Sequence, residues 1–275
     1  MKMYVLKIIL IIILVYLLML MPNMNKERKE AMSSFEDVYI AHRGLFNNVD
    51  IPENSLIAFK KAVKHGYGIE LDVQMTTDKK LVVFHDANLF RMCGVDKKLT
   101  DCTFEELQKY SLVNTEHKIP LFEDVLKELD KDTPLIVEIK PEGPCIETCD
   151  LSVEMLKNYD LNYVMESFNP LVVYHLKKNY PDIIRGQLAY NMFKDKKNTA
   201  NMFVKFVGTN LLANFLTKPD FVAYDVRNKN NLSFNIVSRL YKAECVAWTV
   251  KNQRMLKECD GLYQQIIFDS FIPKK

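Results

Sequence analysis

The sequence predicts an α/β protein, a (β/α)8 TIM barrel preceded by a single N-terminal transmembrane helix. After a long apolar segment at the N-terminus, eight short aliphatic and β-branched runs alternate with stretches of helical periodicity. This alternation implies parallel strands with right-handed crossovers, and the remaining length of about 240 residues suits such a barrel. We therefore divide the chain into an anchor with its linker, residues 1–34, and a barrel, residues 35–275.

The composition of the 275-residue chain is that of an ordinary globular protein. Hydrophobic residues make up 48% and charged residues 26% of the chain, which excludes a disordered or fibrous protein. The 37 basic and 35 acidic side chains give a formal net charge of +2. Bulk charge therefore gives no case for a nucleic-acid partner. The sequence leaves the oligomeric state open.

The N-terminal segment is apolar over the length of a membrane span. The apolar stretch covers residues 4–21 with only Lys7 charged, and as a helix it would reach about 27 Å against about 30 Å of hydrocarbon. A cleaved signal peptide is the alternative, because its apolar core has a comparable length. Residues 21–25 directly after the run hold no pair of small residues for cleavage. We expect an uncleaved single-pass anchor, and the basic residues on both sides leave the membrane side of the barrel open.

The strands and helices of the barrel are predicted in order along the chain. The strand-like runs are residues 38–41, 68–74, 81–85, 135–140, 163–168, 183–188, 221–226 and 245–250. Helical spacing of apolar residues predicts helices at 54–65, 122–129, 170–178, 232–241 and 252–259. The interval 86–134 is too long for one crossover, so we expect an additional small unit near residues 89–110.

Charged side chains gather at the ends of the first four predicted strands. Glu70 and Asp72 are two residues apart in one strand, and Glu138 and Lys140 in another, so each pair points to one face. Barrel enzymes assemble their sites at this end. Burying three converging carboxylates is costly, and one divalent cation, Mg²⁺ or Ca²⁺, would relieve the cost. The alternative is that each carboxylate pairs with a nearby lysine or arginine.

Two histidines and two cations lie beside these carboxylates. His42 follows the first predicted strand and His85 ends the third, and such a pair suits general acid–base catalysis near neutral pH. Arg43 offers a bidentate fork for phosphate, and Lys140 a point charge. With a metal ion, these groups indicate hydrolysis of an anionic phosphoester.

Taken together, these segments resemble the glycerophosphodiester phosphodiesterase family. Each short motif is weak alone, but their order and spacing from about residue 38 to 269 are specific. The matching segments are Ala41-His42-Arg43-Gly44, Pro52-Glu53-Asn54-Ser55, Gly68-x-Glu70-Leu71-Asp72-Val73, Val82-Val83-Phe84-His85-Asp86, Ile119-Pro120-Leu121, Val137-Glu138-Ile139-Lys140, Ser167-Phe168 and Ala247-Trp248-Thr249-Val250.

The resemblance implies a barrel that cleaves glycerophosphodiesters to glycerol 3-phosphate and an alcohol, with a small or lipid-derived substrate. Glu53 is expected to support the site, or else to be a carboxylate at a helix N-terminus. Trp248 is expected either to line the mouth or to be a packed core aromatic. By position, the implied metal ligands are Glu70, Asp72 and Glu138, the acid–base pair is His42 and His85, and the phosphate contacts are Arg43 and Lys140.

One stretch departs from the family pattern. Where the family continues with Asp-Gly, two hydrophobic residues and Thr-Asp, this chain runs from Asp260-Gly261 through Gln264 to Asp269. That leaves the contacts at the substrate end undetermined.

Two other functions stay open. They are a phospholipase D-like enzyme acting on lysophospholipids and a non-catalytic binding module on the same barrel. The complete set of polar residues argues against the binding module.

The cysteines give no strong prediction. Cys145 and Cys149 follow the predicted strand at 135–140, and we expect them in a loop overhanging the site, as free thiols more than as a redox pair. Zinc would need two more soft ligands nearby, and the sequence offers none.

Overall fold

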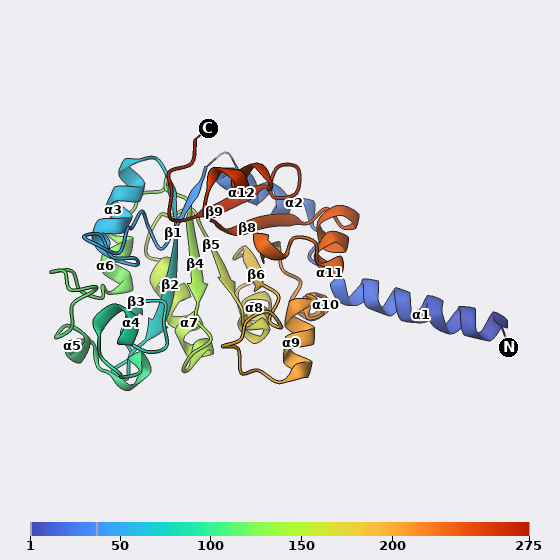
Figure 1. The fold of residues 1–275 in the computed structure, drawn as a ribbon, viewed down its shortest axis with the longest axis horizontal. Coiled ribbons are helices and arrows are strands. Elements are labelled where there is room, and N and C mark those ends of the chain that lie inside the picture. The colour runs from blue at the N-terminus through green and yellow to red at the C-terminus, as the bar shows by residue number, and fades with distance from the viewer. Residues whose placement is uncertain (1, 37, 275) are drawn as a thin grey trace.

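The computed structural model describes residues 2–36 and 38–274 and forms a closed barrel of eight parallel strands (Figure 1). The barrel closes because β1 pairs with both β2 and β9. The predicted (β/α)8 architecture is thereby confirmed. Its parallel strands are β1 (Ile40–His42), β2 (Gly68–Met75), β4 (Leu135–Ile139), β5 (Tyr163–Ser167), β6 (Arg185–Ala189), β7 (Phe221–Asp225), β8 (Glu244–Val250) and β9 (Gln265–Phe268).

Two of the predicted strand assignments need correction. The run at 81–85 forms β3 (Leu81–Val83), which is antiparallel to β2 and pairs Val73 with Val83. The connection over residues 76–80 is too short for a crossover to a parallel strand, which needs about a dozen residues. The eighth barrel strand is instead β9, which the sequence analysis treated as a stretch beyond the last strand. Its four residues are too few to give a strong strand pattern.

Helices cover the outside of the barrel, and each of the five predicted helical stretches contains one. The stretch at 232–241 continues from α11 into a π-helical turn, Ile236–Leu240. The helices are α3 (Leu56–Lys64), α6 (Phe122–Leu126), α7 (Cys145–Leu156), α8 (Pro170–Asn179), α9 (Met202–Thr209), α10 (Asn214–Thr217), α11 (Leu232–Asn235) and α12 (Gln253–Lys257).

Helix α7 occupies the place where a loop with Cys145 and Cys149 was expected, so that expectation was wrong. Polar residues interrupt its apolar pattern, yet Thr148 and Ser152 are buried. Their hydroxyls donate to the carbonyl oxygens of Pro144 and Thr148, at 3.1 and 2.7 Å. These local bonds let hydroxyl side chains occupy the buried face. All six cysteines are free thiols.

The expected small unit between β3 and α6 is present. It contains α4 (Phe90–Cys93), a 3-10 turn (Leu99–Asp101) and α5 (Phe104–Leu107). A capping box joins Thr103 and Glu106 at the start of α5. The unit has an apolar core of its own, made of Val82, Phe84, Leu89, Met92, Leu99, Cys102, Leu107, Leu112 and Ile119.

The floor of the barrel is closed by residues that precede β1. The stretch expected to be a polar linker forms α2 (Lys26–Glu30) and a 3-10 helix (Ala31–Phe35). Met32 and Phe35 are buried in the cluster that fills the barrel interior. The guanidinium of Arg28 binds the Asp220 carboxylate twice, at 2.6 and 2.7 Å. The charged side chains that the sequence predicts for the site lie at the opposite, carboxyl end of the strands.

Helix α1 (Lys2–Leu20) projects from the body and meets it only through its last residues (Figure 1). Tyr241 donates its hydroxyl proton to the Leu17 carbonyl at 2.7 Å, and the hydroxyls of Tyr16 and Ser233 are also 2.7 Å apart. Leu20 is buried. Among the described residues this helix alone is long and apolar enough to cross a membrane.

Candidate active site

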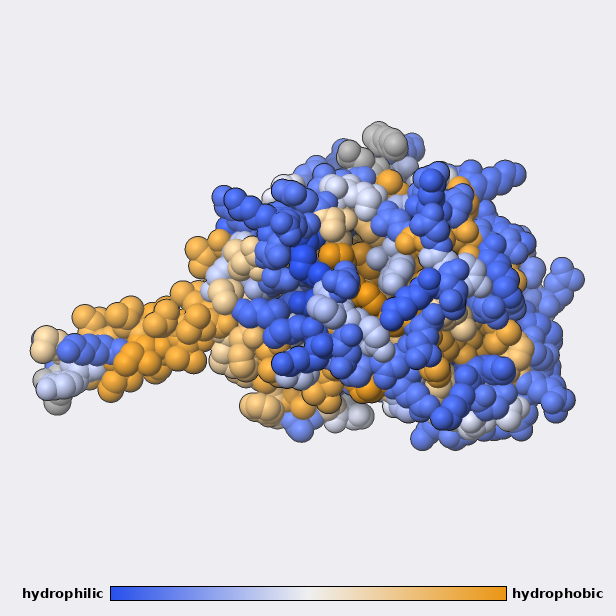
Figure 2. Space-filling view, turned by 180° about the vertical axis from the view of Figure 1, so that it is seen from behind, coloured by the Kyte–Doolittle hydropathy of each residue, from blue (hydrophilic) through white to orange (hydrophobic). Residues whose placement is uncertain are grey.

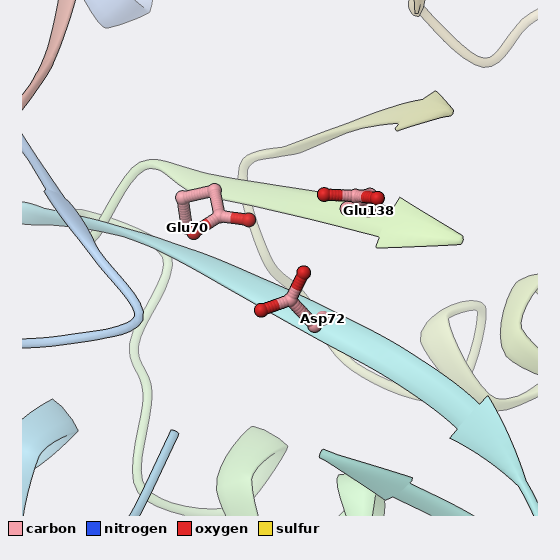
Figure 3. A group of neighbouring side chains, drawn as sticks. All are labelled: Glu70, Asp72 and Glu138. Atoms are coloured by element: carbon pink, nitrogen blue, oxygen red, sulfur yellow. The ribbon is translucent and has the colours of Figure 1, made fainter. Parts of the chain in front are cut away.

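Three carboxylates converge inside the carboxyl end of the barrel (Figure 3). Glu70 and Asp72 come from β2, and Glu138 comes from β4, where it is in register with Asp72. One oxygen from each residue lies within 4.8 Å of the other two, and all three side chains are buried. The two-residue spacing in β2 therefore places both side chains on one face, as the sequence predicts.

The pKa shifts of the three carboxyls show that negative charge is unfavourable in this buried cluster. Burial and the neighbouring Asp72 and Glu138 raise the pKa of Glu70 well above its ordinary value. Burial raises the pKa of Glu138 to about 8, although Lys140 opposes this. For Asp72 the effect of burial is outweighed by Lys140, His85 and Arg43, which hold its pKa well below the ordinary value. The ionised forms of all three are not stable together without further positive charge.

Glu166 is a fourth buried carboxylate that the sequence analysis did not single out. It lies on β5 in register with Glu138, and burial and the Glu138 charge raise its pKa well above the ordinary value. Its Oε2 has no hydrogen-bond partner among the described residues. A sequence signal for Glu166 was available. It lies two residues before Phe168 in a predicted strand, so both side chains point to the same face, the inward one. Because the cluster holds more carboxylates than the contacting cations Arg43 and Lys140, its donor set fits a hard divalent ion.

His42 lies at the end of β1 between two carboxylates. Its Nδ1 is 3.0 Å from Oδ2 of Asp269, and its Nε2 is 3.9 Å from Oε2 of Glu70. Burial and the Arg43 charge lower the pKa of His42 to about 4, against the effect of Asp269. We assign the proton of the neutral ring to Nδ1, because Asp269 can only accept it. The lone pair of Nε2 then faces the carboxylate cluster.

His85 follows β3 and lines the cleft at the mouth. Its Nδ1 is 2.6 Å from Oδ1 of Asp86. Burial and Lys140 lower the pKa of His85. Both His42 and His85 lie close enough to Asp72 to lower the pKa of its carboxyl. The structure thus brings both histidines to the carboxylate cluster, although they are separated in the sequence by β2.

The backbone after β1 turns sharply and aims Arg43 inward. Arg43 has a φ of 56°, and its backbone N–H donates to Oε2 of Glu70 at 3.0 Å. Gly44 follows with a φ of 81°, and a Cβ there would lie 2.8 Å from the backbone of Ala58. Only glycine fits this turn without strain. The Arg43 Nε then lies 3.3 Å from Oδ2 of Asp72.

Glu53 supports Arg43 through a chain of ion pairs. Arg43 Nη1 lies 2.6 Å from Glu53 Oε1. Arg91, from α4, binds both oxygens of Glu53 at 2.7 and 2.8 Å and donates from Nε to Asp86 at 2.6 Å. Asp86 in turn contacts His85, so the chain of ion pairs links Arg43 to His85. No local pattern in the sequence signals this contact, because Arg91 is 38 residues from Glu53.

Lys140 and Trp248 border an open cleft above the cluster. Lys140 Nζ lies 2.9 Å from Oε1 of Glu138 and 3.3 Å from Oδ1 of Asp72. The cleft has a volume of about 840 Å³, and its walls include His85, Lys140, Phe168, Tyr190, Asp225 and Trp248. Trp248 donates its indole N–H to the Ala223 carbonyl at 3.0 Å and meets Phe168 edge-on at 5.4 Å. Trp248 therefore both lines the mouth and packs in an aromatic group.

A parallel barrel whose mouth brings together clustered carboxylates, two histidines, an arginine and a lysine carries the groups that hydrolysis of a phosphodiester needs. The family model of the glycerophosphoryl diester phosphodiesterases matches residues 42–271. The chain belongs to this family, which confirms the resemblance inferred from its motifs.

Relatives agree with this assignment, and a solved structure agrees with the fold. YhdW of Bacillus subtilis strain 168, provisionally named a glycerophosphodiester phosphodiesterase, is 31% identical over 232 residues, 78% of this chain and 86% of that protein. A glycerophosphodiester phosphodiesterase of Caldanaerobacter subterraneus is 35% identical over 160 residues, 54% of this chain and 65% of that protein. A phosphodiesterase of Oleispira antarctica, solved with its product sn-glycerol-3-phosphate, has a TM-score of 0.69 at 22% identity, covering 86% of this chain and 94% of that one.

Proposed function

We propose that this protein is a membrane-anchored, metal-dependent phosphodiesterase that hydrolyses glycerophosphodiesters to glycerol 3-phosphate and an alcohol. The observation that carries the proposal is the buried cluster of Glu70, Asp72 and Glu138 with His42 and His85 beside it. The family membership and the product bound to the Oleispira antarctica phosphodiesterase support the same substrate class.

The proposed metal ligands are Glu70, Asp72 and Glu138, for one Mg²⁺ or Ca²⁺ ion. Their oxygens lie within 4.8 Å of one another in a buried setting, and an all-oxygen donor set suits these hard cations. When bound, the ion supplies positive charge that draws electron density from a phosphate oxygen. We do not propose Glu53 as a metal ligand, because its carboxylate is held in ion pairs with Arg43 and Arg91.

The proposed general acid and general base are His42 and His85. One histidine accepts the proton of the nucleophile as its oxygen attacks phosphorus, and the other protonates the oxygen of the departing alcohol as its bond to phosphorus breaks. The nucleophile is water or the neighbouring glycerol hydroxyl, which would give a cyclic phosphate first. Arg43 and Lys140 orient the phosphate and stabilise its growing charge.

Helix α1 is the proposed single-pass anchor. Residues Met3 to Val15 are exposed along it, and its 19 residues are long and apolar enough for a span. A signal sequence shares these properties. We propose that the catalytic barrel follows at residues 35–275, with residues 26–34 packed against its floor. Full-length protein is therefore the appropriate material for assays, since truncation at Phe35 removes the Arg28–Asp220 ion pair.

A second candidate function is hydrolysis of lysophospholipids. The observation that favours it is an apolar pocket of about 150 Å³ between β6 and α9. Phe168, Tyr190 and Met192 line both this pocket and the polar cleft. A substrate with its phosphodiester at His85 and Lys140 could therefore place an apolar substituent in the neighbouring pocket.

Choline release by the full chain in detergent tests both candidates. The substrates are glycerophosphocholine and lysophosphatidylcholine, each with Mg²⁺, Ca²⁺ or chelator, and glycerol 3-phosphate is assayed as well. Metal-dependent turnover of glycerophosphocholine is expected. Turnover of the lysolipid alone would transfer the assignment to the second candidate. A folded protein inert toward both, and toward glycerophosphoethanolamine and glycerophosphoglycerol, would contradict the proposal and favour a binding module.

A further inference from the structure

Helices α9 and α10 present an apolar face to solvent. On α9, Met202, Phe203 and Phe206 are 71%, 75% and 52% exposed, and on α10 Phe215 and Leu216 are also exposed. The opposite side of α9 is held to the barrel, where Tyr224 donates its hydroxyl proton to the Thr209 carbonyl at 2.9 Å. Large apolar side chains gathered on one face of a folded protein indicate a contact surface.

This face adjoins the base of α1. The side-chain N–H of Asn214 in α10 donates to the Leu20 carbonyl oxygen at 3.1 Å, and Lys218 Nζ lies 3.0 Å from the Met21 carbonyl oxygen. Figure 1 shows α9 and α10 beside the point where α1 leaves the body. Figure 2 shows apolar surface continuing from the projecting helix onto the adjoining part of the body. The two apolar surfaces are therefore neighbours and not separate features.

The length of α1 determines how close the body must lie to a bilayer. Its 19 residues extend about 28 Å as a helix, against a hydrocarbon thickness of about 30 Å. A span uses the whole helix, including Leu17 and Leu20, which contact the body. No free segment then separates the bilayer from the body, so the surface around Leu20 lies at the membrane boundary.

We propose that the α9–α10 face, defined by Met202, Phe203, Phe206, Phe215 and Leu216, sits in the headgroup–acyl boundary of the bilayer that α1 spans. The inference rests on the proposed anchoring by α1. A lipid surface is the occupant because a protein partner would have to displace lipid from the base of the helix. Lysines border the face, among them Lys177, whose Nζ lies 2.7 Å from the Leu216 carbonyl oxygen. Such an apolar face with a basic margin suits an interface with phospholipid headgroups.

The placement bears on how substrate reaches the site. The loop between β6 and α9 contributes Asn191, Lys194 and Lys197 to the wall of the catalytic cleft. In Figure 1, β2 and β4 run across the direction in which α1 leaves the body. With α9 in the interface, one rim of the mouth lies at the headgroup level. Lipid-derived diesters can then enter the cleft along the bilayer surface.

Tryptophan fluorescence in vesicles of brominated lipid tests whether α9 lies at the bilayer surface. Phe206→Trp and Phe90→Trp change one exposed phenylalanine each, and Phe90 is 65% exposed on α4, on the side of the body away from α1. The native Trp248 contributes the same background to both full-length variants. The vesicles contain phosphatidylcholine and phosphatidylglycerol, with bromine on the acyl chains. Flotation after carbonate washing measures insertion of α1 separately.

The expected result is flotation of both variants, with the added emission of Phe206→Trp quenched at least about twofold and that of Phe90→Trp unchanged. Flotation without quenching at position 206 would overturn the α9–α10 proposal and leave the anchor intact. Equal quenching at both positions would also overturn it, because the face would not be the specific contact. Loss of flotation would overturn the proposed anchor, and with it this inference.

Discussion

The imidazole Nδ1 of His42 lies 3.0 Å from the Asp269 carboxylate, across the line where β1 and β9 close the barrel. The two residues are 227 positions apart. Ser270 donates its hydroxyl proton to the other Asp269 oxygen at 2.6 Å. Asp269 thus holds the ring with Nδ1 protonated and Nε2 free to exchange a proton at the cluster. We regard Asp269 as a positioning residue for His42.

Asp269→Asn should lower kcat by about 10²-fold or more, because an amide can donate to Nδ1 and so favour the wrong tautomer of the ring. The pH–rate profile should also change, which loss of packing alone would not cause. Lys251→Ala is the matched control, since Lys251 Nζ lies 3.5 Å from Asp269 and is mostly exposed. Wild-type turnover and an unchanged pH profile in Asp269→Asn would show that Asp269 does not position the ring.

Removal of either histidine tests the acid–base pair directly. His42→Ala and His85→Ala should each lower kcat by about 10²–10⁴-fold while the thermal unfolding temperature stays close to wild type. His65→Ala controls for loss of an imidazole, because His65 caps the end of α3, where its Nδ1 lies 2.8 Å from the Lys61 carbonyl oxygen and its ring stacks on Tyr67. Turnover near the wild-type rate in either variant would remove that histidine from the mechanism.

The parts of the site that sequence could predict depend on short-range periodicity. Glu70 and Asp72 share a face because strand side chains alternate with a period of two, and the same rule relates Glu138 to Lys140. Alternation of strand and helix then predicts parallel strands whose ends meet in a barrel. Each inference uses residues within a few positions of one another, so a single sequence suffices.

The parts that sequence missed depend on contacts between distant segments. Asp269 meets His42 only because β9 closes the barrel, and β9 was too short to be recognised. Arg91 reaches Glu53 from an inserted unit whose orientation no local pattern specifies. Glu166 had the correct inward position, but a lone glutamate carries no pattern of its own. The hairpin of β2 and β3 was missed because strand runs reveal no direction.

Metal binding can be measured apart from turnover. Isothermal titration of chelator-treated protein with Mg²⁺ or Ca²⁺ should show one site, and Asp72→Asn should weaken it at least about tenfold, because the cation loses a buried charged ligand. Chelation should abolish phosphodiesterase activity, and the added ion should restore it. Glu105→Gln, an exposed residue of α5, is the control. Full activity after exhaustive chelation would contradict the metal assignment.

Arg91 links Glu53 to Asp86, and through Asp86 to His85. Arg91→Lys keeps one positive charge but cannot bind two carboxylates with a planar fork. We expect a fall in kcat of about tenfold, with a change in the pH–rate profile as His85 loses its orientation. Lys97→Ala, which removes a cation from the same small unit, should leave turnover unchanged. A pH profile identical to wild type would limit Arg91 to a structural role.

The ion pairs of Glu53 should make stability depend on pH in the acid range. Against the effect of burial, Arg91 and Arg43 lower the pKa of Glu53 from 4.5 to about 2. Between these values the unfolded chain binds a proton that the folded chain does not, so stability falls as the pH falls through this window. The shift corresponds to about 3 kcal/mol, fully present above about pH 4.5 and lost below about pH 2.

Urea unfolding of wild type and Glu53→Gln at several pH values measures this contribution. The difference in the free energy of unfolding between them should be largest near pH 6 and shrink by about 3 kcal/mol as the pH falls toward 2. Glu105→Gln, with its exposed side chain, should follow the wild type at every pH. A difference between wild type and Glu53→Gln that stays constant from pH 6 to pH 2.5 would mean that Arg43 and Arg91 do not hold Glu53 ionised. The charged chain from Arg43 to His85 would then contribute to the shape of the mouth without stabilising the folded state in this pH range.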